Sequence, residues 1–137
     1  MNPTLKNILA VILGLIVGMV VNGGLIMISG SIIPPPEGAD MTTTEGLKAI
    51  MPELEPKHFL MPFLAHALGT LVGALIAVKI GATNHLRLAF IIAGVFLAGG
   101  IYMVATMPSP FWFSAVDLIG AYIPMGWLGW WISRTKS

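Results

Sequence analysis

The residue with the most evident chemistry is Asp117, the one carboxylate within an apolar stretch, residues 111–132. A carboxylate in hydrocarbon is costly, so such residues usually face other helices, have a polar partner and mark a functional site. His66, within the apolar stretch 59–80, is the best candidate for that partner. An imidazole beside a buried carboxylate can share a proton with it, because burial disfavours the carboxylate charge while a neighbouring positive charge favours it. Asp117 and His66 therefore predict a site for a proton or a cation.

Further polar side chains share the depth of this pair. With ~1.5 Å of rise per residue, His66 lies roughly 10 Å and Asp117 roughly 9 Å below the outer ends of their helices. Asn22, in the first apolar stretch, and Tyr102, in the third, fall at about the same level. Thr70 follows His66 by one turn on the same helix face. We therefore predict a single polar layer in the outer half of a helical bundle.

Two interpretations of this layer stay open. In the first, the layer faces outward and binds or transports a small solute or a cation. In the second, the chain is a non-catalytic accessory or scaffold subunit, and the buried polar groups only fix how the helices pack. A cavity that reaches His66 and Asp117 from outside favours the first, whereas a tight contact without a void favours the second.

A transition-metal site has weaker support. Glu55 and His58 are three residues apart at the start of the second apolar stretch, and Met61 follows shortly after. Imidazole and thioether groups are ligands for metals such as Cu(I), so these residues are the metal candidates, and the identity of any metal stays open. His58, His66 and His85 lie at three depths, which argues against a haem held between two of them.

No activated nucleophile, metal triad or cofactor motif accompanies the polar layer. The chain has no cysteine, which removes disulfide exchange and thiolate metal ligands. We therefore expect no catalytic residue, no enzymatic activity and no cofactor.

The elements that position these residues follow from composition. The 137 residues are 56% hydrophobic and 9% charged, far from the ~25% charged residues of a soluble domain. Four apolar stretches are each close to the ~20 residues that a helix needs to cross a bilayer, and they cover about 5–28, 59–80, 86–107 and 111–132. We predict one all-α domain, a polytopic bundle of four transmembrane helices. The lipid bilayer is its main expected partner, and no nucleic acid is expected.

Positive charge divides unevenly between the two sides. The N-terminus, the second loop and the C-terminus hold five basic residues, Lys6, Lys79, Arg87, Arg134 and Lys136. The long first loop, 34–56, holds five of the six acids, and its only basic residues are Lys48 within it and Lys57 directly after it. The positive-inside rule then places both termini in the cytoplasm and the acidic loop outside.

Two local patterns complete the predicted architecture. In the first loop, Thr42 and Glu45 have the spacing of a capping box, which predicts a short interfacial helix that ends before Pro52. In the last apolar stretch, Pro124 should kink the helix near Gly120.

Small residues at four-residue spacing mark the faces through which helices pack in lipid. They are Gly14 and Gly18 in the first stretch, Gly69 and Gly73 in the second, and Gly120 in the fourth. Because so short a bundle exposes much small-residue surface, we expect a homo-oligomer.

Several segments resemble small four-span bacterial inner-membrane proteins of unassigned function. They are IPPPEG at 33–38, EPKHF at 55–59, AHALGT at 65–70 and DLIGAYIPMG at 117–126. The resemblance implies a bacterial cytoplasmic membrane and carries no mechanism. The chain is also similar in size to small multidrug transporters, whose essential carboxylate lies in the first span. This chain departs from that pattern, because Asn22 is the polar residue of its first span.

Overall fold

A computed structural model describes residues 1–135, which form helices joined by turns. The elements are α1 (Pro3–Ile32), α2 (Thr44–Ile50), η1 (Met51–Glu53), η2 (Pro56–Phe59), α3 (Leu60–Ile80), α4 (His85–Thr106), α5 (Phe111–Gly120) and α6 (Ile123–Thr135). Four segments are long and apolar enough to cross a membrane: Pro3–Ile32, Pro56–Ile80, His85–Thr106 and Phe111–Arg134. The structure therefore confirms the prediction of an all-α chain with four candidate membrane spans.

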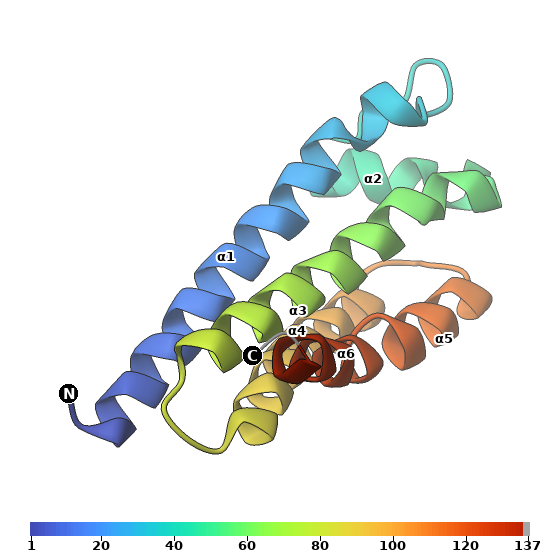
Figure 1. The fold of residues 1–137 in the computed structure, drawn as a ribbon. Helices are drawn as coiled ribbons and strands as arrows, with labels where there is room; N and C mark the ends of the chain where they lie inside the picture. Colours follow the sequence, from blue (N-terminus) through green and yellow to red (C-terminus); the bar gives the residue numbers. More distant parts are fainter. Residues whose placement is uncertain (136–137) are drawn as a thin grey trace.

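Helix α3 is the centre of the bundle. It contacts α1, α4 and α6, whereas α1 contacts α3 extensively and α4 only slightly. Figure 1 shows α1 and α3 running side by side along the length of the molecule. The buried core between α3, α4 and α6 contains many alanines, including Ala74, Ala77 and Ala89. Small side chains allow these helix backbones to come close together, as is common for helices packed in lipid.

Four glycines form the contact between α1 and α3. A Cβ atom on Gly14 would lie 2.6 Å from the carbonyl oxygen of Gly73, and one on Gly18 would lie 2.7 Å from that of Gly69. The reverse distances, from Gly69 and Gly73 to the same two α1 residues, are 2.9 and 2.8 Å. No larger residue fits here without moving a backbone, so the two helices depend on glycine at all four positions.

The fourth span is broken into two helices. Helix α5 ends at Gly120, and α6 begins at Ile123. Pro124 lies in the first turn of α6, where the missing N–H would have had no helical partner. The predicted kink is thus a complete break. A Cβ on Gly120 would lie 3.6 Å from the Phe63 ring of α3, an ordinary contact, so α5 packs on α3 at this position without requiring a glycine.

Close packing of the fourth span occurs further along, in α6. A Cβ on Gly126 would lie 2.7 Å from Cβ of Ala93, and one on Gly129 would lie 2.9 Å from the carbonyl oxygen of Leu71. These two glycines bring α6 against α4 and α3.

Loop 34–56, which we call the outer loop after its predicted side of the membrane, contains the expected short helix, α2, but the cap of this helix differs from the prediction. Thr43 is the N-cap, and its hydroxyl accepts from the N–H of Gly46 at 3.0 Å. Thr42 instead donates its hydroxyl and its N–H to Asp40, at 2.6 and 3.0 Å. These bonds, led by that from the hydroxyl, lower the pKa of Asp40. The predicted capping box of Thr42 and Glu45 was therefore wrong: the N-cap is one residue later, and Gly46 has no side chain to complete a box.

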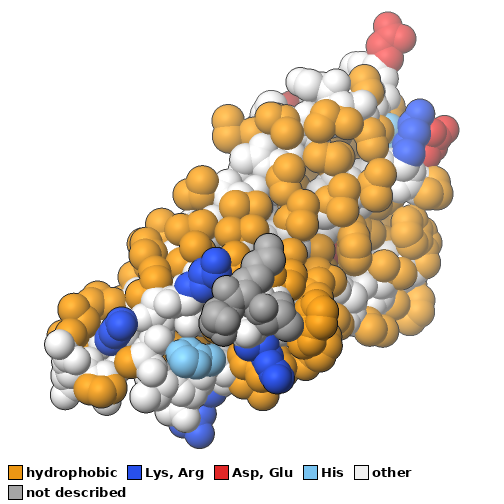
Figure 2. All heavy atoms as spheres, in the orientation of Figure 1, with side chains coloured by type: hydrophobic (Ala, Val, Ile, Leu, Met, Phe, Trp, Pro, Cys, Tyr) orange, Lys and Arg blue, Asp and Glu red, His pale blue; other side chains and the backbone are white. Residues whose placement is uncertain are grey.

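Charged side chains gather at the two ends of the molecule. Figure 2 shows Asp and Glu at the end that carries the outer loop, and most Lys and Arg at the end near the N-terminus. Between the ends, the visible surface is largely hydrophobic. Lys136, which the sequence analysis counted among the basic residues, lies outside the described residues.

We predict that Gly18→Leu will destabilise the protein by about 1–3 kcal/mol or prevent its accumulation, because a side chain there meets the Gly69 backbone. Gly23→Leu is the matched control on α1, since a Cβ at Gly23 has no neighbour within 4 Å. Thermal unfolding of both variants in the same detergent measures the difference. Equal losses in the two variants would contradict the role assigned to this contact.

Candidate functional site

Asp117 and His66 meet in the interior of the bundle. Oδ1 of Asp117, on α5, lies 2.8 Å from Nδ1 of His66, on α3. Asp117 is 3% exposed, so its carboxylate depends mainly on hydrogen-bond partners within the protein, and the His66 imidazole is one of them. The two residues that the sequence analysis placed at one depth are thus in direct contact.

Tyr122 is the second partner of the carboxylate. Its hydroxyl donates to Oδ2 of Asp117 at 3.1 Å, and its ring stacks near His66 with centroids 5.9 Å apart. The glycine at position 100 makes room for it, because a Cβ there would lie 2.6 Å from the hydroxyl oxygen. Both oxygens of Asp117 therefore have a hydrogen-bond partner.

The proton positions follow from these contacts. When Asp117 is ionised it can only accept, so Nδ1 of His66 must carry the hydrogen. In a singly protonated imidazole, Nε2 is then an acceptor. Nε2 makes no hydrogen bond within residues 1–135. The pair therefore presents one unused nitrogen, which can bind a proton or a donor group.

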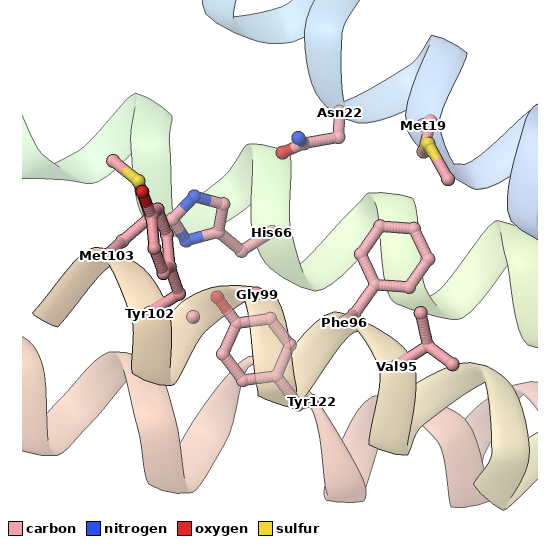
Figure 3. A pocket seen from close by; sticks show the side chains of 10 residues that line it. Met19, Asn22, His66, Val95, Phe96, Gly99, Tyr102, Met103 and Tyr122 are labelled. Carbon is pink, nitrogen blue, oxygen red and sulfur yellow. The ribbon is translucent and has the colours of Figure 1, made fainter. Parts of the chain in front are cut away.

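Asn22 adds a second unused polar atom. Its Oδ1 is buried and has no hydrogen-bond partner among the described residues. Figure 3 shows its carboxamide reaching from α1 toward the side of the cavity where His66 projects from α3. A buried acceptor without a partner costs ~1–3 kcal/mol, so this atom is suited to receive a hydrogen bond from a ligand or from water.

Two residues of the predicted layer have other roles. The Thr70 hydroxyl donates to the His66 carbonyl oxygen at 2.8 Å, within α3, and Thr70 is fully buried. Tyr102 is 67% exposed and lies at the edge of the site. Residues two apart on a helix point about 200° apart, so α4 cannot direct both Gly100 and Tyr102 toward Asp117. Tyr102 lines the same cavity as Asn22 and His66, but the hydroxyl that reaches Asp117 is that of Tyr122.

A cavity of about 750 Å³ extends from this pair toward the outer loop. His66, Asp117 and Asn22 line its inner part, and Met51 and Leu54 from the loop line its outer part. Met51 is itself buried in a cluster with Phe59 and Phe113. The loop therefore covers the outer side of this cavity, which we call the outer chamber.

A second cavity, of about 380 Å³, adjoins the outer chamber. It lies between α1 and α4 and shares Asn22, His66, Gly100 and Met103 with the chamber. Figure 3 shows Met19, Val95 and Phe96 at the end of this cavity away from His66. We call it the side cleft.

The candidate metal ligands take part in other interactions. Nδ1 of His58 accepts from the N–H of Glu55 at 2.9 Å, so Nε2 carries the hydrogen and donates to the carbonyl oxygen of Pro34 at 3.1 Å. The Glu55 carboxylate pairs with Lys57 at 3.3 Å, and Met61 is buried. Residues 1–135 hold no cluster of three His, Cys, Asp or Glu side chains suited to a metal. The histidine instead ties the end of α1 to the start of α3.

No protein-family model, curated protein or solved structure matches this chain. The chemistry of the site is therefore argued from its own geometry.

Sequence reasoning missed Tyr122, and the break in the fourth span explains why. On a continuous helix, a residue five positions after Asp117 would lie ~7.5 Å deeper and point to a different face. The break at Ala121 and Tyr122 turns the ring back toward the carboxylate. Pro124 was the available signal, because a proline inside a span frees the backbone before it.

Asn7 was also missed. Its carbonyl oxygen accepts from the N–H groups of Ala82 and Thr83, at 2.8 and 3.2 Å, and its amide donates to the Thr83 hydroxyl at 2.9 Å. Asn7 thereby ties the start of α1 to the turn between α3 and α4.

The two tyrosines of the chain offer a matched comparison. Tyr122→Phe removes one donor from a buried carboxylate, and we expect it to cost about 1–3 kcal/mol of stability. Tyr102→Phe removes a hydroxyl from an exposed ring, and we expect a change within about 0.5 kcal/mol. Thermal unfolding in detergent compares the two variants. A loss for Tyr102→Phe as large as that for Tyr122→Phe would contradict the assignment of Tyr122 as the partner of Asp117.

Proposed function

We propose that this chain is a multi-pass protein of the bacterial cytoplasmic membrane that binds a small solute or cation at Asp117 and His66 and transports it. The observation that carries the proposal is the position of this buried pair at the inner end of the outer chamber. A carboxylate in a membrane span is usually functional, and here it adjoins a cavity within the ~300–1,000 Å³ typical of small-molecule sites.

The proposed chemistry is an exchange between a proton and a cation. A cation close to Asp117 and a proton on His66 each neutralise the same carboxylate, so binding of one favours release of the other. Tyr122 holds the second carboxylate oxygen throughout. Exchange at this pair needs no metal, cofactor or nucleophile.

Transport also requires a path through the inner half of the bundle. That half is closed by the glycine contacts between α1 and α3 and by the alanine-rich core of α3, α4 and α6. We propose that the described state is the outward-facing one, and that helix movement in the inner half completes the cycle.

A scaffold role is the alternative, and one observation favours it. His66 and Tyr122 already give both oxygens of Asp117 a partner. Such a satisfied network can serve packing alone. A homo-oligomer is compatible with either function.

We predict that Asp117→Asn will fold but lose ligand binding. Thermal unfolding of wild type and variant is measured with Na⁺, K⁺, Cu(I) and short alkylamines between pH 5 and 9. Wild type should gain stability from at least one of these probes, because a ligand that binds only the folded state stabilises it. At 100 times its dissociation constant the gain is about 2.7 kcal/mol.

Ser114→Ala is the matched control, since Ser114 is a buried polar residue on α5 that lines neither cavity. It should respond to the probes as wild type does. If Asp117→Asn is simply less stable at every pH and no probe stabilises wild type, the scaffold role is the better account.

The proposed orientation has its own test. Because the chain has no cysteine, a single Cys at an exposed loop position is labelled without background. In intact cells, a membrane-impermeant maleimide should label Glu45→Cys in the outer loop, and should label Thr83→Cys in the turn between α3 and α4 only after lysis. The reverse pattern would invert the topology.

A further inference from the structure

The side cleft exists because α1 and α4 separate toward the outer half of the bundle. In the inner half they touch: a Cβ on Gly14 would lie 3.1 Å from Ile92, and one on Gly18 would lie 2.8 Å from the Phe96 ring. Further out, a Cβ on Gly99 meets no atom within 4 Å. The gap therefore begins just beyond Phe96 and reaches the level of Asn22 and His66.

The cleft opens on the side of the bundle. Met19, Val95, Tyr102 and Met103 line it and are also 44–67% exposed. They lie on segments long and apolar enough to span a membrane. In a bilayer, this opening faces hydrocarbon, so a molecule dissolved in lipid can enter from the side.

The polar groups at the inner wall define what such a molecule must carry. With Asp117 ionised and one proton on His66, two acceptors without a partner in the described residues lie at this wall, Nε2 of His66 and the buried Oδ1 of Asn22. The His66–Asp117 pair then has a net charge of −1. A primary ammonium group donates up to three hydrogen bonds and carries the opposite charge. The remaining wall, with Met19, Val95 and Phe96, suits a hydrocarbon tail.

From this juxtaposition we infer that the side cleft binds a cationic amphiphile, a primary ammonium with a hydrocarbon tail, which enters from the membrane between α1 and α4. This inference rests on the proposed function and names its ligand class. The ammonium lies between Asn22 and His66, and the tail extends past Phe96. The unpartnered Asn22 oxygen favours this ligand over a second copy of the chain, whose apolar helix face would leave that atom unsatisfied.

The test measures retention of radiolabelled dodecylamine on protein in nanodiscs, with empty nanodiscs as the blank for partition into lipid. Dodecanol, the neutral analogue, and propylamine, which lacks the tail, are measured in the same way. Gly99→Phe fills the cleft from a position with open space, and Gly94→Phe is the matched control on α4, equally open but outside the cleft. Asn22→Leu removes one acceptor while the cleft remains.

We expect wild type and Gly94→Phe to retain dodecylamine, and Gly99→Phe and Asn22→Leu to bind it at least about tenfold more weakly. Dodecanol and propylamine should be retained less than dodecylamine by wild type. If Gly99→Phe does not fold, Asn22→Leu and the two analogues still decide the matter.

Other outcomes overturn the inference in distinguishable ways. If dodecanol is retained as well as dodecylamine, the ammonium group is not needed for binding. If Gly99→Phe binds dodecylamine as wild type does, the side cleft is not the binding site. Stabilisation by Na⁺ or propylamine without dodecylamine retention leaves the proposed function in place with a water-soluble ligand. A lower oligomeric mass for Gly99→Phe than for Gly94→Phe, with no amine retained by wild type, assigns the cleft to a second copy of the chain.

Discussion

The buried carboxylate of Asp117 is the constraint on which the arrangement of the outer half depends. At 3% exposure it cannot rely on water, so donors must come from neighbouring helices. His66 supplies one from α3, and Tyr122 supplies the other only because the fourth span breaks between α5 and α6. The glycine at position 100 on α4 then leaves room for the tyrosine ring. Satisfying one charge thus sets the relative positions of three spans.

The inner half of the bundle is closely packed and the outer half contains cavities, because the close helix contacts lie in the inner half. Gly14 and Gly18 hold α1 against α3 over the inner half, and Gly126 and Gly129 hold α6 against α4 and α3. Helices in lipid gain little from apolar association, so close packing of small residues is a main source of their attraction. Where such contacts stop, the helices diverge, and the chamber and the cleft occupy the space between them.

The fold was more predictable from sequence than the site. Four apolar stretches were sufficient for the four spans, because helix length and hydropathy are nearly independent of tertiary contacts. Depth counting placed His66 and Asp117 at one level, since each lies on a regular helix counted from its outer end. Depth alone does not give direction around a helix, so counting placed Tyr102 at the level of His66 but could not show that it faces away from Asp117. It missed Tyr122 because a broken helix has no single register. Thr43 rather than Thr42 caps α2, because the N–H and hydroxyl of Thr42 are both hydrogen-bonded to Asp40.

A tight contact between His66 and Asp117 would indicate a packing role, and a cavity that reaches them would indicate a functional one. The structure contains both the contact and the cavity. The two roles can be separated by asking which polar atoms have a hydrogen-bond partner. Both oxygens of Asp117 accept hydrogen bonds within the protein and specify how the helices meet. Nε2 of His66 and Oδ1 of Asn22, only one helix away, have no partner in the described part of the chain. A layer that served packing alone would gain stability if these two atoms were paired or replaced by apolar groups. That they remain unpaired beside a cavity favours a layer whose inner side is structural and whose cavity side is available to a ligand.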